Sequence, residues 1–255
     1  MNSDNRGRVR ALSLASILLA SASPTPLLAQ RVISEEESDP VRTSADGDVT
    51  ILEEAILDVS GANPITIDSN NSVTIEEDAT VQADDSDNRV GIAIESGTTG
   101  TLNNAGDILV TEDFVAEDDD NNGIADGPIA EANNRYGIRV LPGGPTNGTI
   151  IISGDITVEG LSSFGISLES DYAGTIENSG DVLVVGDNSF GVATQSIDGD
   201  LTLGGSVQAV GQGSQAVLID GDISGAFIVN GTLSNSSSFT NNDGFALTLS
   251  RSGLR

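Results

Sequence analysis

A short pattern of one small residue followed by alternating apolar residues recurs six times along this chain, and this recurrence limits the possible folds more than any other feature. The copies start at Gly91, Gly137, Gly165, Gly191, Ala216 and Ala246. Their starts are 46, 28, 26, 25 and 30 residues apart, so the period is close to 26 residues once the first, longer interval is set aside. A fixed period of this size indicates a repeat architecture in which each unit stacks on its neighbours.

Each repeat contains two further short apolar segments after the first. The best example is Gly174–Gly180 followed by Asp181–Gly186, with turn residues between the segments. Three short strands in about 26 residues, without helical periodicity, fit one coil of a parallel β-helix, because a four-stranded propeller blade needs about 40 to 50 residues. We therefore expect an all-β fold, a right-handed parallel β-helix (solenoid) of about seven three-strand coils with a narrow aliphatic core. An aromatic content of only 3% agrees with such a core.

One column of aspartates recurs where the third strand of a repeat begins. Asp107, Asp155 and Asp181 each follow a glycine, and Ser206 and Thr232 take the same place in later repeats. Clustered aspartates serve catalysis in some β-helical polysaccharide enzymes. Because a hydroxyl group replaces the carboxylate along the same column, we favour hydrogen bonding of these side chains to backbone N–H groups of the turn.

The composition excludes most side-chain catalysis. The 255 residues include no His and no Cys, and all ten basic residues are Arg. Imidazole and thiolate chemistry, Cys/His metal sites and a Schiff-base lysine are therefore absent. The formal net charge of −29 repels nucleic acid and anionic membranes and attracts cations. We expect a protein that is not an enzyme, requires no cofactor and binds no nucleic acid.

The first 29 residues have the pattern of a secretory signal peptide. Arg6, Arg8 and Arg10 precede an apolar stretch from Ala11 to Ala22, and Ala29 offers a small residue for cleavage. The stretch is too short to span a bilayer. We expect residues 1–29 to be removed, residues 30–47 to form a disordered acidic lead-in, and residues 48–255 to form the β-helix. The mature chain would lie at the cell surface or outer membrane, in the extracellular medium or in the periplasm.

The signal peptide followed by units such as Gly174–Val182, with Asp187–Val192 leading into the next coil, resembles the passenger regions of bacterial autotransporters. The resemblance covers about residues 48–235 and is one of repeat style. It implies a parallel β-helix that acts in adhesion, aggregation or surface coating, with cell-surface components, matrix components or further copies of itself as partners. Passenger regions precede a C-terminal β-barrel, whereas only six residues follow Leu249 here, without the alternating strands of a barrel.

The 46-residue interval holds about 20 surplus residues, which we place in an insertion at about residues 112–133. Loops inserted into solenoids commonly carry function. The acidic part of this loop matches the opening of a calcium-binding loop, with oxygen ligands expected from Asp118, Asp120, Asn122, Ile124 through its carbonyl, and Asp126. Position twelve of the motif is Ile129 instead of Glu, so the alternatives are a weak Ca²⁺ site and a solvated acidic loop.

Two functions follow from these observations. The first is an exported, non-enzymatic β-solenoid with a structural or adhesive role and a weak calcium-binding loop. The alternative is a β-helical polysaccharide lyase or hydrolase, since paired carboxylates can cleave glycosidic bonds without His. The first hypothesis accounts for the absence of Lys, the scarcity of aromatic residues and the turn chemistry of the aspartate column.

Overall fold

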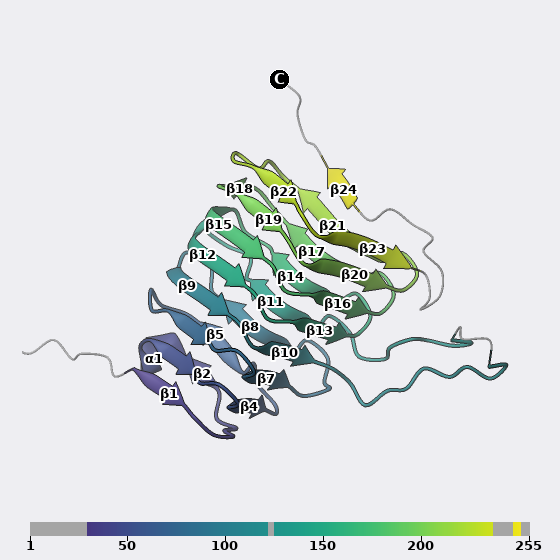
Figure 1. Ribbon diagram of the computed structural model, residues 1–255, viewed down its shortest axis with the longest axis horizontal. Coiled ribbons are helices and arrows are strands. Elements are labelled where there is room, and N and C mark those ends of the chain that lie inside the picture. Colours follow the sequence, from purple (N-terminus) through teal and green to yellow (C-terminus); the bar gives the residue numbers. More distant parts are fainter. Residues whose placement is uncertain (1–29, 122–124, 237–246, 251–255) are drawn as a thin grey trace, which may run out of the picture.

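The computed structural model describes residues 30–121, 125–236 and 247–250, and the predicted signal peptide lies outside them. The strands wind into a parallel β-solenoid of about seven turns with three sheets, which confirms the expected fold class (Figure 1). Most turns, or rungs, contribute one strand to each sheet. Every strand pair in the described residues is parallel, as stacked rungs require.

The strands fall into three stacks. The first sheet contains β1 (Arg31–Ile33), β3 (Val49–Ile51), β6 (Val73–Ile75), β9 (Thr99–Asn104), β12 (Thr146–Ile152), β15 (Tyr172–Asn178), β18 (Ile197–Asp198), β19 (Leu201–Leu203) and β22 (Phe227–Val229). The second contains β4 (Ile56–Val59), β7 (Thr80–Ala83), β10 (Asp107–Val110), β13 (Ile156–Glu159), β16 (Val182–Val185), β20 (Ser206–Val210) and β23 (Thr232–Ser236). The third contains β2 (Val41–Arg42), β5 (Ile65–Ile67), β8 (Val90–Ile94), β11 (Tyr136–Val140), β14 (Phe164–Leu168), β17 (Phe190–Thr194), β21 (Gln215–Asp220) and β24 (Leu247–Ser250).

Columns of aliphatic side chains fill the interior. In the third sheet Ile138 lies in register between Ile92 on the rung before and Ile166 on the rung after, and all three are at most 1% exposed. Burying one such side chain contributes roughly 1.5–3 kcal/mol. Because each rung buries its inward residues against two neighbours, stability accumulates along the solenoid.

Glycine occupies corners where successive rungs approach closely. A Cβ atom at Gly180 would lie 2.0 Å from the carbonyl oxygen of Gly154 on the preceding rung. The same contact recurs at Gly205, where the added atom would lie 2.0 Å from the Gly180 oxygen. These glycines immediately precede the aspartate column and its continuation, so the corner itself requires them.

Residues 30–47 form an ordered first rung, contrary to the expected disorder. They contain β1, β2 and the four-residue helix α1 (Thr43–Asp46), and Ile33 and Val41 are buried in the core. The Arg31 guanidinium forms ion pairs with Glu37 and Asp46 and donates hydrogen bonds to two backbone carbonyl groups of the same segment. The composition of this segment is polar and acidic, but the buried Ile33 and Val41 and the ion pairs of Arg31 order it.

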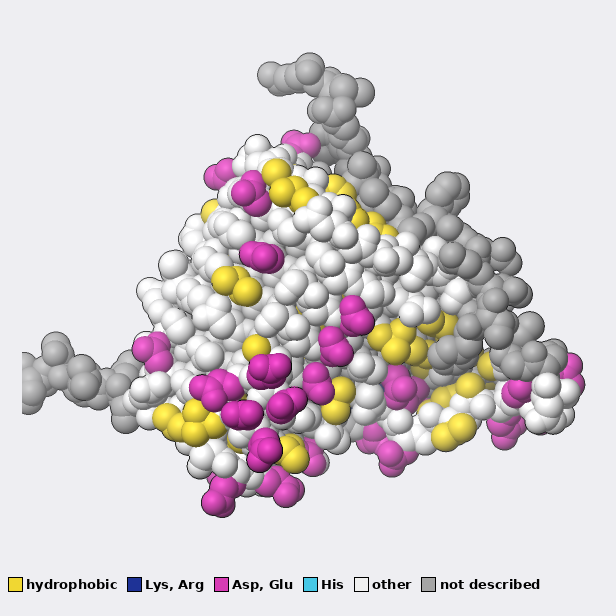
Figure 2. All heavy atoms as spheres, viewed as in Figure 1, with side chains coloured by type: hydrophobic (Ala, Val, Ile, Leu, Met, Phe, Trp, Pro, Cys, Tyr) yellow, Lys and Arg dark blue, Asp and Glu magenta, His cyan; other side chains and the backbone are white. Residues whose placement is uncertain are grey.

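The outer surface is strongly acidic. Figure 2 shows Asp and Glu side chains spread over the visible face and most dense over the N-terminal rungs, in the lower part of the view. Among the described residues, no helix has the length and apolar character needed to cross a membrane.

Candidate functional site at the insertion

The aspartate column takes part in turn hydrogen bonds between rungs. Asp155 Oδ1 accepts a hydrogen bond from the N–H of Asp181 at 3.0 Å, and Asp181 Oδ1 accepts one from the N–H of Ser206 at 2.9 Å. The prediction of turn bonding is therefore confirmed for these two residues. Such bonds satisfy backbone donors at a corner where the strand ladder is interrupted.

The insertion leaves the solenoid after β10 and returns before β11, and Figure 1 shows it projecting sideways from the body as a long teal loop. The rungs before and after the insertion are hydrogen-bonded to each other directly. Asn134 Nδ2 donates to Asn88 Oδ1 at 2.7 Å, and the N–H of Tyr136 donates to the carbonyl of Arg89 at 2.8 Å. The ladder thus continues across 46 residues of sequence, so the rungs do not depend on the insertion for their register.

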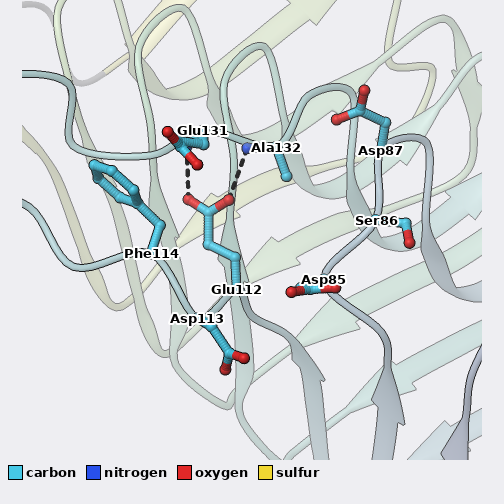
Figure 3. Close-up of a pocket in the computed structure, with 8 residues that line it drawn as sticks. All are labelled: Asp85, Ser86, Asp87, Glu112, Asp113, Phe114, Glu131 and Ala132. Atoms are coloured by element: carbon cyan, nitrogen blue, oxygen red, sulfur yellow. Dashed lines mark hydrogen bonds between the residues drawn. The ribbon is translucent and has the colours of Figure 1, made fainter.

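Glu112 holds the two ends of the insertion together. Its carboxylate accepts hydrogen bonds from the backbone N–H groups of Glu131 at 2.8 Å and Ala132 at 2.7 Å (Figure 3). Its own N–H donates to Glu159 Oε2 on the next rung at 3.0 Å. One side chain therefore closes the base of the loop and joins it to the solenoid.

Arg135 is fully buried beside this base. Its guanidinium donates to the carbonyl oxygens of Asp84 at 2.7 Å, Thr111 at 2.8 Å and Glu159 at 2.9 Å, which lie on three successive rungs. Burial lowers the pKa of Arg135, and the nearby Glu112 carboxylate acts in the opposite direction. The corresponding position holds Arg89 on the preceding rung and serine on later rungs, beginning with Ser163, so the repeat pattern did not single out Arg135 as a buried cation.

An open hollow of about 510 Å³ lies at the base of the insertion. It is lined by Asp85, Ser86, Asp87, Glu112, Asp113, Phe114, Glu131 and Ala132. In Figure 3 the Glu112 carboxylate points toward Glu131 and Ala132 on the returning segment of the insertion, away from Asp85 and Asp113. Five of the eight lining residues are acidic and the others are one serine, one phenylalanine and one alanine, so the hollow disfavours anionic ligands.

The tip of the insertion brings together three of the five predicted calcium ligands. One carboxylate oxygen from each of Asp118, Asp120 and Asp126 lies within 4.8 Å of the others. Asp126 Oδ2 accepts hydrogen bonds from the N–H groups of Asp119 at 2.7 Å and Asp120 at 3.3 Å. Asn122 and Ile124, the other two predicted ligands, lie outside the described residues.

Three carboxylates at this separation offer oxygen donors of the kind that Ca²⁺ prefers. All three residues are exposed. The arrangement is therefore suited to weak binding of a hard cation. It is not suited to acid–base chemistry that needs a desolvated carboxyl group.

Comparison with known families identifies the family of this chain from most of its length. Residues 15–207 match the family described as the BigA third pectate lyase-like domain, which is well over half of the sequence. The chain belongs to this family. No curated protein and no solved structure matches the sequence. The pectate lyase-like name agrees with the β-solenoid fold, and the matched part of this domain includes the insertion and its base.

The pectate lyase-like domain also carries an aromatic stack on the outer side of its third sheet, which the sequence reasoning missed. The rings of Tyr136 and Phe164 are 5.0 Å apart, and those of Phe164 and Phe190 are 5.3 Å apart. Burial raises the pKa of Tyr136. The rings cover one another's faces, so the stack joins rungs and offers little flat surface to a ligand. Tyr136, Phe164 and Phe190 each come directly before the repeated glycine, so their recurrence in the sequence could have revealed the stack.

Every arginine in the described part of this domain is engaged. Arg139 points outward and donates to both Glu169 oxygens, at 2.9 and 2.8 Å. The remaining ion pairs join Arg31 to Glu37 and Asp46, Arg42 to Asp68, and Arg89 to Asp84. Burial alone would raise the pKa of Asp84, but hydrogen bonds from Arg89 and from backbone N–H groups hold it well below its ordinary value. Since these cations are already paired, the surplus carboxylates dominate the outer surface.

Proposed function

We propose that the protein is an exported, non-enzymatic β-solenoid, similar to an autotransporter passenger, in which the rungs are a scaffold and the insertion is a contact element. The observation that carries this proposal is the continuous ladder across the base of the insertion, from Asn88 to Asn134 and from Arg89 to Tyr136. The chain keeps a long acidic loop that the ladder does not need. Solenoids commonly place binding functions on such loops.

The acidic exterior indicates the kind of partner. A surface whose arginines are already paired attracts cationic groups, or other anionic surfaces bridged by divalent cations. Cell-surface components, matrix components or further copies of the chain are the proposed partners, and nucleic acid is not. Export would follow from the predicted signal peptide at residues 1–29, with delivery to the cell surface, the medium or the periplasm.

Calcium binding at the tip is part of this proposal. The loop motif and the proximity of the Asp118, Asp120 and Asp126 carboxylates support it independently. A single exposed site of this kind should have a dissociation constant of about 10⁻⁴ to 10⁻³ M, as in extracellular modules. No cofactor is required by the rungs.

Calorimetric titration of the mature chain with CaCl₂ tests the tip. We expect binding heat that disappears in Asp118→Ala/Asp120→Ala. Asp119→Ala is the matched control, because the Asp119 side chain is outside the three-carboxylate group and its backbone N–H still reaches Asp126. Identical heats for the wild type and the double variant would remove the calcium proposal.

Adhesion is tested separately by coating beads with the mature chain and measuring their capture by bacterial cells and by beads carrying the same chain. We expect capture to depend on residues 112–131 and to fall when Ca²⁺ is chelated. Equal capture after deletion of these residues would show that the insertion is not the contact element.

Polysaccharide cleavage is the second candidate, favoured by the pectate lyase-like name of the family. The test is the release of unsaturated or reducing ends from polygalacturonate by the mature chain. We expect none. Cleavage that is lost in a folded Asp155→Ala/Asp181→Ala variant would reverse the ranking of the two functions.

A further inference from the structure

The two ends of the solenoid are closed to different degrees. At the N-terminal end Arg31 takes the inward position that Val49 holds on the next rung, and its guanidinium forms ion pairs with Glu37 and Asp46. Ile33, the other inward residue of the same strand, is 1% exposed. A charged side chain at an inward position of an edge strand opposes the pairing of a further strand. The N-terminal end is therefore protected against strand addition.

The corresponding inward positions at the C-terminal end are open. Phe227 and Val229 in β22 lie in register with the core residues Leu201 and Leu203. Leu203 is fully buried, whereas Val229 is 40% exposed, because no strand in the described part of the chain pairs with the outer edge of β22. Ile228, on the outward side of β22, is also 40% exposed. Figure 2 shows hydrophobic side chains at the upper end of the molecule, where Figure 1 places β22.

The sequence of this edge carries no feature that opposes pairing. Residues 223–236, which contain β22 and β23, include no charged residue and no proline, although the chain has a net charge of −29. Natural edge strands are commonly protected by charges or proline. Two copies that approach side to side bring acidic surfaces together, whereas two C-terminal edges meet without repulsion between like charges. The charge distribution therefore favours contact between copies at this edge.

We propose that the outer edge of β22 is a homodimer interface, at which β22 of a second copy pairs antiparallel about a two-fold axis through Ile228. In this register Ile228 lies opposite Ile228 of the second copy, and Phe227 lies opposite Val229 of the second copy. Inward-facing side chains therefore meet inward-facing side chains, so the apolar core continues from one copy into the other. Both copies use the same patch, as a closed two-fold dimer requires.

Head-to-tail stacking is the competing arrangement, in which β1 of one copy pairs with β22 of the other. Arg31 and Phe227 occupy the two ends of one inward column of the first sheet. Head-to-tail stacking would place the Arg31 charge against Phe227 in an apolar contact, which is costly. Pairing through two C-terminal edges avoids this cost.

The dimer does not involve the insertion, so it is independent of the function proposed for that loop. Each copy keeps its own insertion, and a dimer would present two of them to one surface. Two linked contact elements bind more tightly than one when both can engage. Because the C-terminal edges of a dimer are already occupied, capture between coated beads would still depend on the insertions.

Sedimentation equilibrium of the mature chain tests the interface over about 1 to 100 µM, the range of dissociation constants expected for a small contact. We expect the mass to rise to twice that of the monomer. Ile228→Lys should keep the protein monomeric, because lysine on an edge strand opposes pairing. Val32→Lys is the matched control, since Val32 is an outward residue of β1 at the other end of the same sheet and is 51% exposed. This control should dimerise like the wild type.

A single introduced cysteine reports the orientation of the two copies, because the chain contains no Cys. Residues directly opposite in an antiparallel pair have Cβ atoms about 4.5–5.5 Å apart, near enough for a disulfide after a small adjustment. We expect Ile228→Cys to form covalent dimers when oxidised with copper–phenanthroline, and Val32→Cys to remain monomeric.

A wild type that stays monomeric, a dimer that survives Ile228→Lys, or a dimer that Val32→Lys abolishes would overturn the proposal. So would the absence of covalent dimers of Ile228→Cys, which decides the question if Ile228→Lys does not fold. Mixed disulfides between Val32→Cys and Ile228→Cys, identified by mass spectrometry, would indicate head-to-tail stacking and contradict the two-fold arrangement. Deletion of residues 112–131 should leave the dimer intact, so failure of this proposal is distinguishable from failure of the function proposed for the insertion.

Discussion

The rungs and the insertion are stabilised in different ways, and the difference separates a tightly packed scaffold from a loop that is held at a few points. A rung residue such as Ile138 is buried between identical residues on both sides, whereas Val115 in the insertion is 80% exposed. The insertion is fastened at its base by Glu112 and organised at its tip by Asp126. A substitution in a rung should therefore disturb the packing of both neighbouring rungs, while a substitution in the insertion should affect the structure of the insertion alone.

The largest expected effect is at Arg135, where the rungs meet the base of the insertion. Arg135→Met should lower the free energy of unfolding by about 3–5 kcal/mol, because it leaves three partly buried carbonyl groups without their charged donor. Chemical denaturation measures this change. Arg139→Met, which removes a half-buried surface ion pair, should cost about 1 kcal/mol or less. Equal losses in the two variants would show that Arg135 does not join the rungs.

A methyl group at a rung corner should have the next largest effect. Gly180→Ala places a Cβ 2.0 Å from the Gly154 carbonyl oxygen, so the two rungs must move apart, at a cost of about 2–3 kcal/mol. Gly144→Ala is the control, since nothing lies within 4 Å of its added atom. Urea unfolding of both variants checks the comparison, and an unchanged midpoint for Gly180→Ala would contradict the corner geometry.

Acid should weaken the N-terminal rungs through Asp84. The folded state lowers the pKa of this carboxyl group, so its stabilisation is complete above the unfolded value near 4 and is lost as the pH falls through the lower folded value. Asp84→Asn should cost about 1 kcal/mol at neutral pH, and its difference from the wild type should shrink below about pH 4. A stability difference between the wild type and Asp84→Asn that grows on acidification would contradict a lowered pKa of Asp84 in the folded state.

The smallest effect on global stability is expected at the base of the insertion. Glu112→Gln leaves one accepting oxygen for two N–H donors, so the amides of Glu131 and Ala132 should exchange faster. The free energy of unfolding should change by less than about 0.5 kcal/mol. Native-state hydrogen exchange and denaturation together check this, and a large global loss would mean that the insertion supports the rungs.

The rungs could be predicted because their residues repeat. The copies of the Gly-Ile pattern lie in register in the third sheet. Asp107, Asp155 and Asp181 lie at the same corner of successive rungs. Some of the residues that were missed, such as the stack of Tyr136, Phe164 and Phe190, also repeat, whereas others depend on contacts that no repeat shows. Arg135 bonds to carbonyl groups up to 51 residues away, and Ile33 and Val41 are two apolar residues in a segment whose composition is acidic.

The candidate site was predictable in part for the same physical reason. The spacing of Asp118, Asp120 and Asp126 follows a local loop motif, and the structure brings these carboxylates together. The clamp by Glu112 and the hollow beside it depend on contacts between the insertion and turns that are distant in sequence. No local pattern could reveal them.

The most direct test of whether the rungs form a scaffold that does not need the insertion is to delete the insertion. The ends of the deletion are chosen from the strand pairing with the next rung. Val110 pairs with Val158 and Asn133 with Leu161, so deleting residues 112–131 with Ala132→Gly would give this rung the same turn as Glu159–Gly160. We expect cooperative unfolding with a midpoint within about 3 °C of the wild type, together with loss of calcium binding heat and of bead capture. A midpoint lower by more than about 10 °C, or calcium binding and capture that survive the deletion, would contradict the division between scaffold and insertion.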